Sequence, residues 1–109
     1  GTTTPRAGLD VTHNDGIIAT GALNSGNTDN LPTGRGSRML WIPKLGAFRA
    51  GMARGDEWDV ANIGRFSVAL GDQTQASGIA ATALGLLSSA TGEASLALGS
   101  GSVASGVSS

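Results

Sequence analysis

Few side chains in this 109-residue chain could do chemistry, and they do not form a recognised catalytic set. His13 is the only histidine and there is no cysteine. A Ser-His-Asp site would have to be built around that single ring, and disulfides and thiolate metal sites are excluded. His13 is followed by Asn14 and Asp15, a pattern typical of a solvated turn. We therefore expect no catalytic residue and no enzyme activity.

A small acidic cluster is the best candidate for a metal site. Its members are Asp56, Glu57 and Asp59. Such carboxylates could hold a hard cation, but Arg54 and Trp58 are interleaved with them, which favours a set of surface ion pairs. Arg38 and Arg49 alternate with apolar neighbours, and we expect them to pair with the cluster across chains. The Gly-Arg-Gly at 34–36 lacks the strand, turn and helix context of a phosphate-binding loop, so no metal and no cofactor is expected.

Glycine recurs every seven residues through the second half of the chain. The positions are Gly64, Gly71, Gly78, Gly85, Gly92, Gly99 and Gly106. The residue before each one alternates between leucine and a hydroxyl residue from position 70 onward, so the true period is fourteen. A short fixed repeat builds a stack of identical coils rather than a globule. We expect the glycines to form the turns of these coils.

Other structures with a short glycine or heptad period are excluded. A coiled coil needs two large apolar residues per heptad, and each glycine in a helix interior costs roughly 1 kcal/mol. Collagen needs glycine at every third residue, and the calcium-binding nonapeptide roll needs aspartate in each turn. A coil of alternating strands and turns remains.

Three segments of the repeat are predicted as short strands, at residues 65–70, 79–84 and 93–98. Bulky side chains alternate with alanine and serine, so the two faces differ in size. A half-coil of about five strand residues, at roughly 3.3 Å each, brings the two walls close together, and only small side chains fit between them. The bulky face must then point outward, where an apolar stripe is typical of a protein interface.

We therefore expect obligate self-association about an axis parallel to the stack. The expected contact residues are Val68, Leu70, Leu84, Leu96 and Leu98. In the alternative arrangement, the leucines fill the interior of a monomeric coil and the alanines face water. That alternative would leave each coil with one buried leucine, which is too little buried apolar surface to stabilise a monomer of this size.

The repeat units also resemble the head repeats of trimeric autotransporter adhesins, the YadA-like head domains. The matching units are residues 67–71, 82–85 and 95–99, each followed by Ala-Ser-Gly or Ala-Thr-Gly, and the resemblance covers roughly residues 61–109. It implies an all-β fold, a left-handed parallel β-roll with three chains to a head and the bulky strand face on the trimer axis. Two departures are mild: Ala81 stands where the repeat has serine, and Asn62-Ile63 precedes the first glycine.

The first sixty residues differ in composition, with most of the charge and three of the four aromatic residues. We expect residues 1–60 to form an N-terminal β-rich cap or neck and residues 61–109 to form the head repeats. A terminal unit must cover the open edge and interior of the first coil. The expected plugs are Trp41, Phe48 and Trp58.

Turn signals and alternation predict the elements of this unit. We expect strands at 9–11 and 16–20 around a hairpin turn at 14–16, a loop at 24–36, and strands at 38–42 and 46–50. The segments 38–44 and 47–51 also resemble a region found in surface and fibre proteins upstream of such head repeats.

The composition sets limits on partners. A net charge of −1 and the lack of any dense basic run argue against nucleic-acid binding. No apolar run is long enough to span a bilayer and no signal peptide is present, so we expect a fragment whose anchor is missing and which does not itself contact a membrane.

Three functions remain open at this stage. The first is a non-enzymatic, homotrimeric adhesin head that binds a matrix protein or a surface glycan, displayed on the cell surface by an outer-membrane anchor. The second is a segment of a phage or virus fibre, or a purely structural stalk or spacer. The third, a flat ice-binding or crystal-binding face, needs regular Thr-x-Thr rows on the outward turns. The rows found are too mixed: Thr74, Ser88 and Ser102, and Ser77, Thr91 and Ser105.

Overall fold

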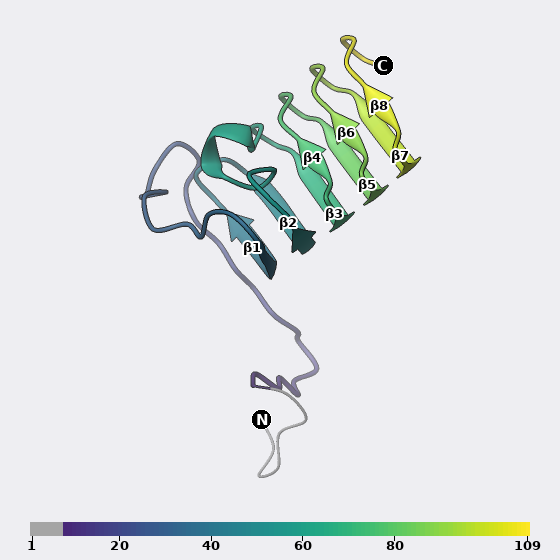
Figure 1. Ribbon diagram of the computed structural model, residues 1–109. Coiled ribbons are helices and arrows are strands. Elements are labelled where there is room, and N and C mark those ends of the chain that lie inside the picture. The colour runs from purple at the N-terminus through teal and green to yellow at the C-terminus, as the bar shows by residue number, and fades with distance from the viewer. Residues whose placement is uncertain (1–7) are drawn as a thin grey trace.

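Two parallel sheets, joined coil by coil, form the second half of the molecule (Figure 1). The computed structural model describes residues 8–109. Long strands β3 (Val68–Asp72), β5 (Thr82–Leu86) and β7 (Leu96–Ser100) lie in one sheet. Short strands β4 (Gln75–Ala76), β6 (Ser89–Ala90) and β8 (Val103–Ala104) form the other. The chain passes from one sheet to the other and back every fourteen residues, as the period predicts.

A hairpin extends the long sheet at its N-terminal end. Strands β1 (Gly36–Ile42) and β2 (Ala47–Ala53) pair antiparallel, and β2 pairs parallel with β3, which gives the order β1-β2-β3-β5-β7. The strands expected at 38–42 and 46–50 are therefore confirmed to within a few residues. One turn of 3-10 helix, Val60–Asn62, leads into the first coil, and no α-helix occurs within residues 8–109. The described part of the chain is all-β.

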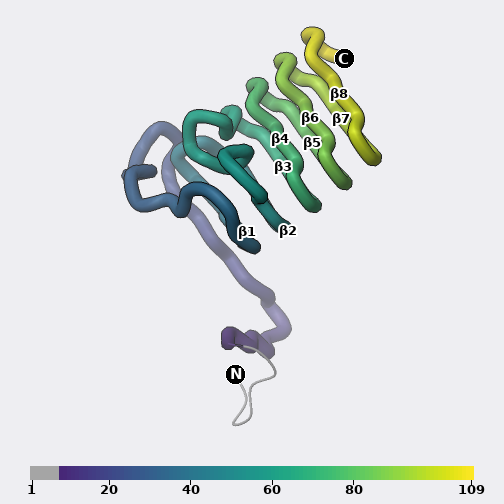
Figure 2. The backbone as a smooth tube through the Cα atoms, viewed as in Figure 1, coloured from purple at the N-terminus to yellow at the C-terminus, as the bar shows by residue number. Residues whose placement is uncertain are grey.

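The strands expected at 9–11 and 16–20 are not formed. Residues 14–15 make a turn, closed by the Gly16 amide donating to the His13 carbonyl at 3.2 Å, but no strand pairing flanks it. Figure 2 shows this part of the chain running away from the body toward the N-terminus.

Strand boundaries in the coils lie two to three residues later than the alternation predicts. The cause is a left-handed turn residue in each coil: Phe66 has φ 60°, Ala80 has φ 59° and Ala94 has φ 55°. These residues belong to the turn, so β3, β5 and β7 begin two positions after them. The register is nevertheless exact to the repeat, since Val68 pairs with Thr82 and Thr82 with Leu96.

The space between the two sheets, here called the lumen, is lined along the coils by small side chains only. Its buried lining is Ser67, Ala69, Thr74, Ala76, Ala81, Ala83, Ser88, Ala90, Ser95, Ala97 and Ala104. By contrast Leu96 is 54% exposed and Leu98 is 63% exposed. The leucines therefore lie outside, and the alternative that they fill the lumen is wrong. Thr74 and Ser88, assigned from sequence to outward turns, are also inside, because they occupy the same inward position of successive coils.

Two lumen serines, Ser67 and Ser95, donate hydrogen bonds to the backbone of their own turns. The hydroxyl of Ser95 donates to the Gly92 carbonyl at 2.7 Å, and Ser67 makes the same bond to Gly64. Ala81 takes this position in the middle coil and is fully buried. The departure from the repeat at Ala81 thus removes one hydrogen bond and leaves the packing unchanged.

The repeated glycines are required by the spacing of the coils. Gly71, Gly85 and Gly99 lie inside strands rather than in turns, with φ between 115° and 119°. A Cβ on Gly78 would lie 2.2 Å from the Gly92 carbonyl oxygen of the next coil, which is far inside van der Waals contact. Because that atom is backbone and accepts hydrogen bonds from the Ser95 amide and hydroxyl, it cannot move aside as the end of a flexible side chain could.

No helix in residues 8–109 is both long enough and apolar enough to cross a membrane.

Replacing Gly78 by alanine is expected to cost about 1–3 kcal/mol of unfolding free energy, because the added methyl group overlaps the next coil. The matched control is Gly106→Ala, at the equivalent position, where the nearest atom to a new Cβ is Ser109 Cβ at 3.6 Å. Urea unfolding followed by circular dichroism measures both. Equal stability of the two variants would contradict the steric explanation.

Candidate functional site

The outer face of the long sheet, which points away from the lumen, carries two columns of large side chains. Cross-strand partners share a face, so the register places them. One column is Val68, Thr82 and Leu96, and the other is Leu70, Leu84 and Leu98. Exposure rises toward β7, because each side chain in the middle of a column is covered by its neighbours. All five residues expected from sequence to make self-association contacts lie in these two columns, Val68 and Leu96 in the first and Leu70, Leu84 and Leu98 in the second.

Both columns continue onto the hairpin, which the sequence analysis did not foresee. Trp41 pairs with Phe48 and Phe48 with Val68, while Met39 pairs with Ala50 and Ala50 with Leu70. Met39 is 76% exposed and Trp41 is 44% exposed. The outer face is therefore one apolar surface across all five strands.

The placement of Trp41 and Phe48 corrects their expected role as plugs of the lumen. In β2 the inward residues are Ala47 and Arg49, both fully buried, so Phe48 between them faces out. Trp41 pairs with Phe48 across the hairpin, so it faces outward as well. The alternation of small and large side chains in Ala47–Ala53 indicates two faces of a strand, but it does not say which face is inward. The charge of Arg49 favours the opposite orientation, with the arginine exposed to water.

Trp58 and Arg49 occupy the end of the lumen. Trp58 is fully buried among the lumen alanines, and its Nε1–H donates to the Thr74 carbonyl at 2.8 Å. The Arg49 guanidinium donates to the Phe48 and Ala76 carbonyls and to the Ser67 hydroxyl at 2.9–3.0 Å. Burial lowers the pKa of Arg49 to about 10, so the side chain stays charged at neutral pH.

The interchain ion pairs expected of Arg38 and Arg49 do not fit these positions. Arg49 is enclosed by backbone acceptors, and Arg38 donates to the carbonyls of Thr33 and Gly34 within its own chain. Both arginines therefore donate hydrogen bonds within their own chain instead of pairing with the acidic cluster.

The carboxylates of the acidic cluster accept hydrogen bonds from different parts of the backbone and do not converge on one point. A Glu57 carboxylate oxygen accepts the Arg54 amide at 2.9 Å, and an Asp59 oxygen accepts the Gly34 amide at 2.8 Å. Within the described residues no group of three His, Cys, Asp or Glu side chains could hold a metal ion. His13 is exposed and accepts the Asp15 amide at Nδ1, as a turn residue does.

One ion pair borders the outer face. Arg54 donates from Nε and Nη2 to the two carboxylate oxygens of Asp72 at 3.0 and 2.8 Å. Through these hydrogen bonds and its charge, Arg54 holds the pKa of Asp72 below its usual value. Asp72 lies in register with Met52 and Leu86, so the pair marks the polar edge of the apolar columns.

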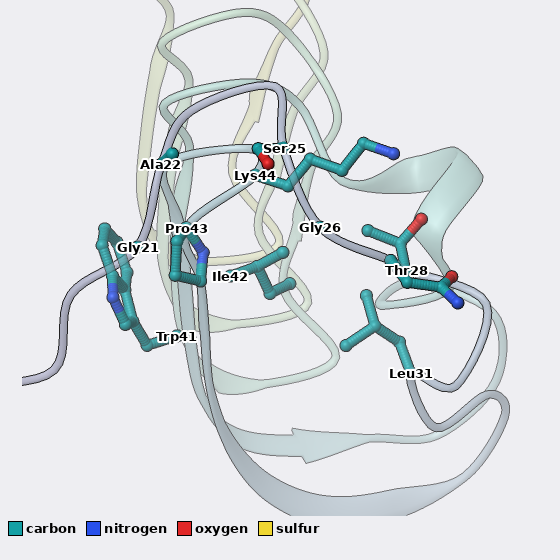
Figure 3. A pocket seen from close by; sticks show the side chains of 11 residues that line it. Gly21, Ala22, Ser25, Gly26, Thr28, Leu31, Trp41, Ile42, Pro43 and Lys44 are labelled. Atoms are coloured by element: carbon teal, nitrogen blue, oxygen red, sulfur yellow. The ribbon is translucent and has the colours of Figure 1, made fainter.

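A shallow pocket of about 330 Å³ lies where the loop at 21–31 crosses the hairpin turn (Figure 3). Leu31, Ile42 and Pro43 give it apolar walls, and Lys44 is its single titratable side chain. Its volume is at the lower limit for small-molecule sites.

Comparison with known proteins gives one match. Two segments, residues 63–88 and 90–109, match the family model of the YadA head domain repeat. No curated protein sequence and no solved structure matches the chain. The resemblance inferred from the repeat units is thereby confirmed for the coils.

Replacing Trp58 by alanine should cost about 3–5 kcal/mol of unfolding free energy, because it opens a cavity at the end of the lumen. Trp58→Phe keeps most of the ring and loses the hydrogen bond to Thr74, so its cost should be smaller. Chemical denaturation of both variants measures the difference. A loss below about 1 kcal/mol for Trp58→Ala would show that the lumen end does not depend on this ring.

The lowered pKa of Asp72 sets the sign of an acid effect on stability. A carboxyl whose folded pKa is depressed stabilises the fold above its unfolded pKa, near 3.8, and this stabilisation is lost as the pH falls through the lower folded value. Arg54→Gln should therefore lower the melting temperature at pH 6 and flatten its decline below about pH 4. Arg65→Gln, which removes a charge that stacks on Phe66 at 5.5 Å, is the control. If the melting temperature of wild type and of Arg54→Gln falls equally steeply below about pH 4, the Arg54–Asp72 pair is not the cause of the acid effect.

Proposed function

Because residues 63–109 carry two YadA-like head domain repeats, we propose that this chain is part of a trimeric surface adhesin head. In this proposal the coils form a left-handed β-roll, and three copies pack their outer faces around a common axis. In this proposal the folded part of residues 1–60 forms the cap and residues 61–109 form the head, and residues 1–7 lie outside the described part of the chain. The observation that carries the proposal is the continuous apolar surface from β1 to β7.

The exposed leucines make a free monomer an unfavourable state. Leu96 and Leu98, with Met39 and Trp41 at the other end of the face, are each at least 44% exposed in the single chain. Contiguous apolar surface of this kind is typical of an interface. Rotational symmetry buries the same patch on every copy, and the family match supports three copies.

Burying one face leaves the other sheet for recognition. Its outward column is Gln75, Ser89 and Val103, which is more polar than the long sheet. A trimer presents three such surfaces, and multivalency strengthens a weak contact without new interactions. We propose a matrix protein or a surface glycan as the ligand, with no catalytic step, on a cell surface where a segment outside this sequence provides the outer-membrane anchor.

A segment of a phage or virus fibre is the second candidate. The continuous pairing of β2 with β3 favours it, because hairpin and coils then form one stiff sheet, as a shaft requires. The same stiffness would serve a structural spacer. The sequence on either side separates these cases: an anchor barrel indicates an adhesin and a tail-attachment domain indicates a fibre.

Leu84→Asp tests the self-association face. Its side chain lies mid-column, and a buried carboxylate without a partner is strongly unfavourable, so the variant should fall from trimer to monomer and melt at a lower temperature. Ser89→Asp, on the outward column of the short sheet, is the control and should remain trimeric. Light scattering and thermal melting report both. If Leu84→Asp stays trimeric with an unchanged melting temperature, the outer face is not the contact between copies.

A further inference from the structure

An arm, residues 8–20, precedes the folded body, and the other described residues of the chain leave its large apolar side chains exposed. Every residue in it is exposed except Asp10, which is half-buried. Leu9 is 80% exposed, Ile17 75% and Ile18 85%. Figures 1 and 2 show the arm leading away from the stacked coils.

The arm has the composition of a strand without the pairing of one. Ile17, Ile18 and Thr20 are β-branched residues, which favour the extended backbone and are enriched in sheets. Strand pairing within the described residues begins only at Gly36. A β-prone segment that has no strand partner among residues 8–109 is suited to pair with another chain.

The point where the arm leaves the body gives its direction. Gly21 lies so close to the hairpin turn that a Cβ there would be 2.5 Å from Pro43 Cβ, and the Asn24 amide donates to the Lys44 carbonyl at 2.9 Å. These contacts hold the chain against the hairpin. In Figure 3 the chain before Gly21 departs beside Trp41, with Ile42 on the opposite side of the strand. The arm therefore starts at the outer face.

We infer that the arm of one copy pairs along the edge strand β1 of a second copy of this chain, which brings Ile17 and Ile18 next to Met39 and Trp41. The inference rests on the proposed function, since it uses the same outer face. Met39 is the most exposed large side chain of the sheet and lies on its edge strand, where no other strand of the described chain covers it. Exchange of arms would cover both sets of apolar side chains and interlock the three chains.

Photo-crosslinking tests the exchange. A benzophenone amino acid is placed at position 18, and the control carries it at position 107, where Val107 is 74% exposed at the far end of the coils. After irradiation of the native assembly, the position-18 protein should give products of two and three chain masses on a denaturing gel, several-fold above the control. Mass spectrometry should map the links to residues 36–53.

A double variant of the arm tests the exchange independently of the crosslinks. Ile17→Ser with Ile18→Ser removes the apolar contact and leaves the coils intact, so it should lower the melting temperature and shift Trp41 emission to longer wavelength in a Trp58→Phe background. A trimer whose position-18 links stay within one chain, or whose melting is unaffected by the serines, would overturn the arm exchange and leave the proposed function standing. A monomer by light scattering would overturn both.

Discussion

The narrow lumen between the two sheets is the constraint on which the rest of the structure depends. Coils stack so closely that a methyl group on Gly78 would overlap the backbone of the next coil, and the walls admit only serine, alanine and threonine. Every larger apolar side chain of the coil strands β3 to β8 is therefore directed outward, whatever its hydrophobicity. The hydrophobic effect, which ordinarily drives such residues into the interior of their own chain, can here act only by bringing in another surface. Self-association is thus a consequence of lumen width.

The end of the stack requires a different solution, because the first coil has no coil below it. Trp58 fills the lumen there and donates to the Thr74 carbonyl, and Arg49 donates to the Ala76 carbonyl, which also accepts the Gly64 amide. A buried arginine without a carboxylate is costly, and this one is tolerated because three acceptors surround its guanidinium at 2.9–3.0 Å. The hairpin adds strands β1 and β2 to the long sheet. It therefore extends the apolar outer face at the same end of the molecule where Trp58 and Arg49 close the lumen.

The sequence predicts the sorting of side chains well, because size alone decides it. Alternation of leucine with alanine in residues 65–98 predicted which residues lie inside, and burial confirms it for Ala69, Ala83 and Ala97. The structural reason for the repeated glycines could not be predicted, because the backbone that approaches each of them lies fourteen residues away and the local sequence does not show this contact. Trp41 and Phe48 were placed in the lumen because aromatic residues usually cover open cores. Arg49 takes that inward position instead, which depends on acceptors supplied by Ser67 and Ala76, far along the chain.

Sedimentation equilibrium of the unmodified chain, over a wide range of concentrations, tests the central claim most directly. If side chains excluded from the lumen are buried between copies, the folded protein should have three times the chain mass of 10.7 kDa down to low concentration, and its dissociation should coincide with unfolding. A folded protein of single-chain mass, with its leucines exposed and no tendency to associate, would contradict it.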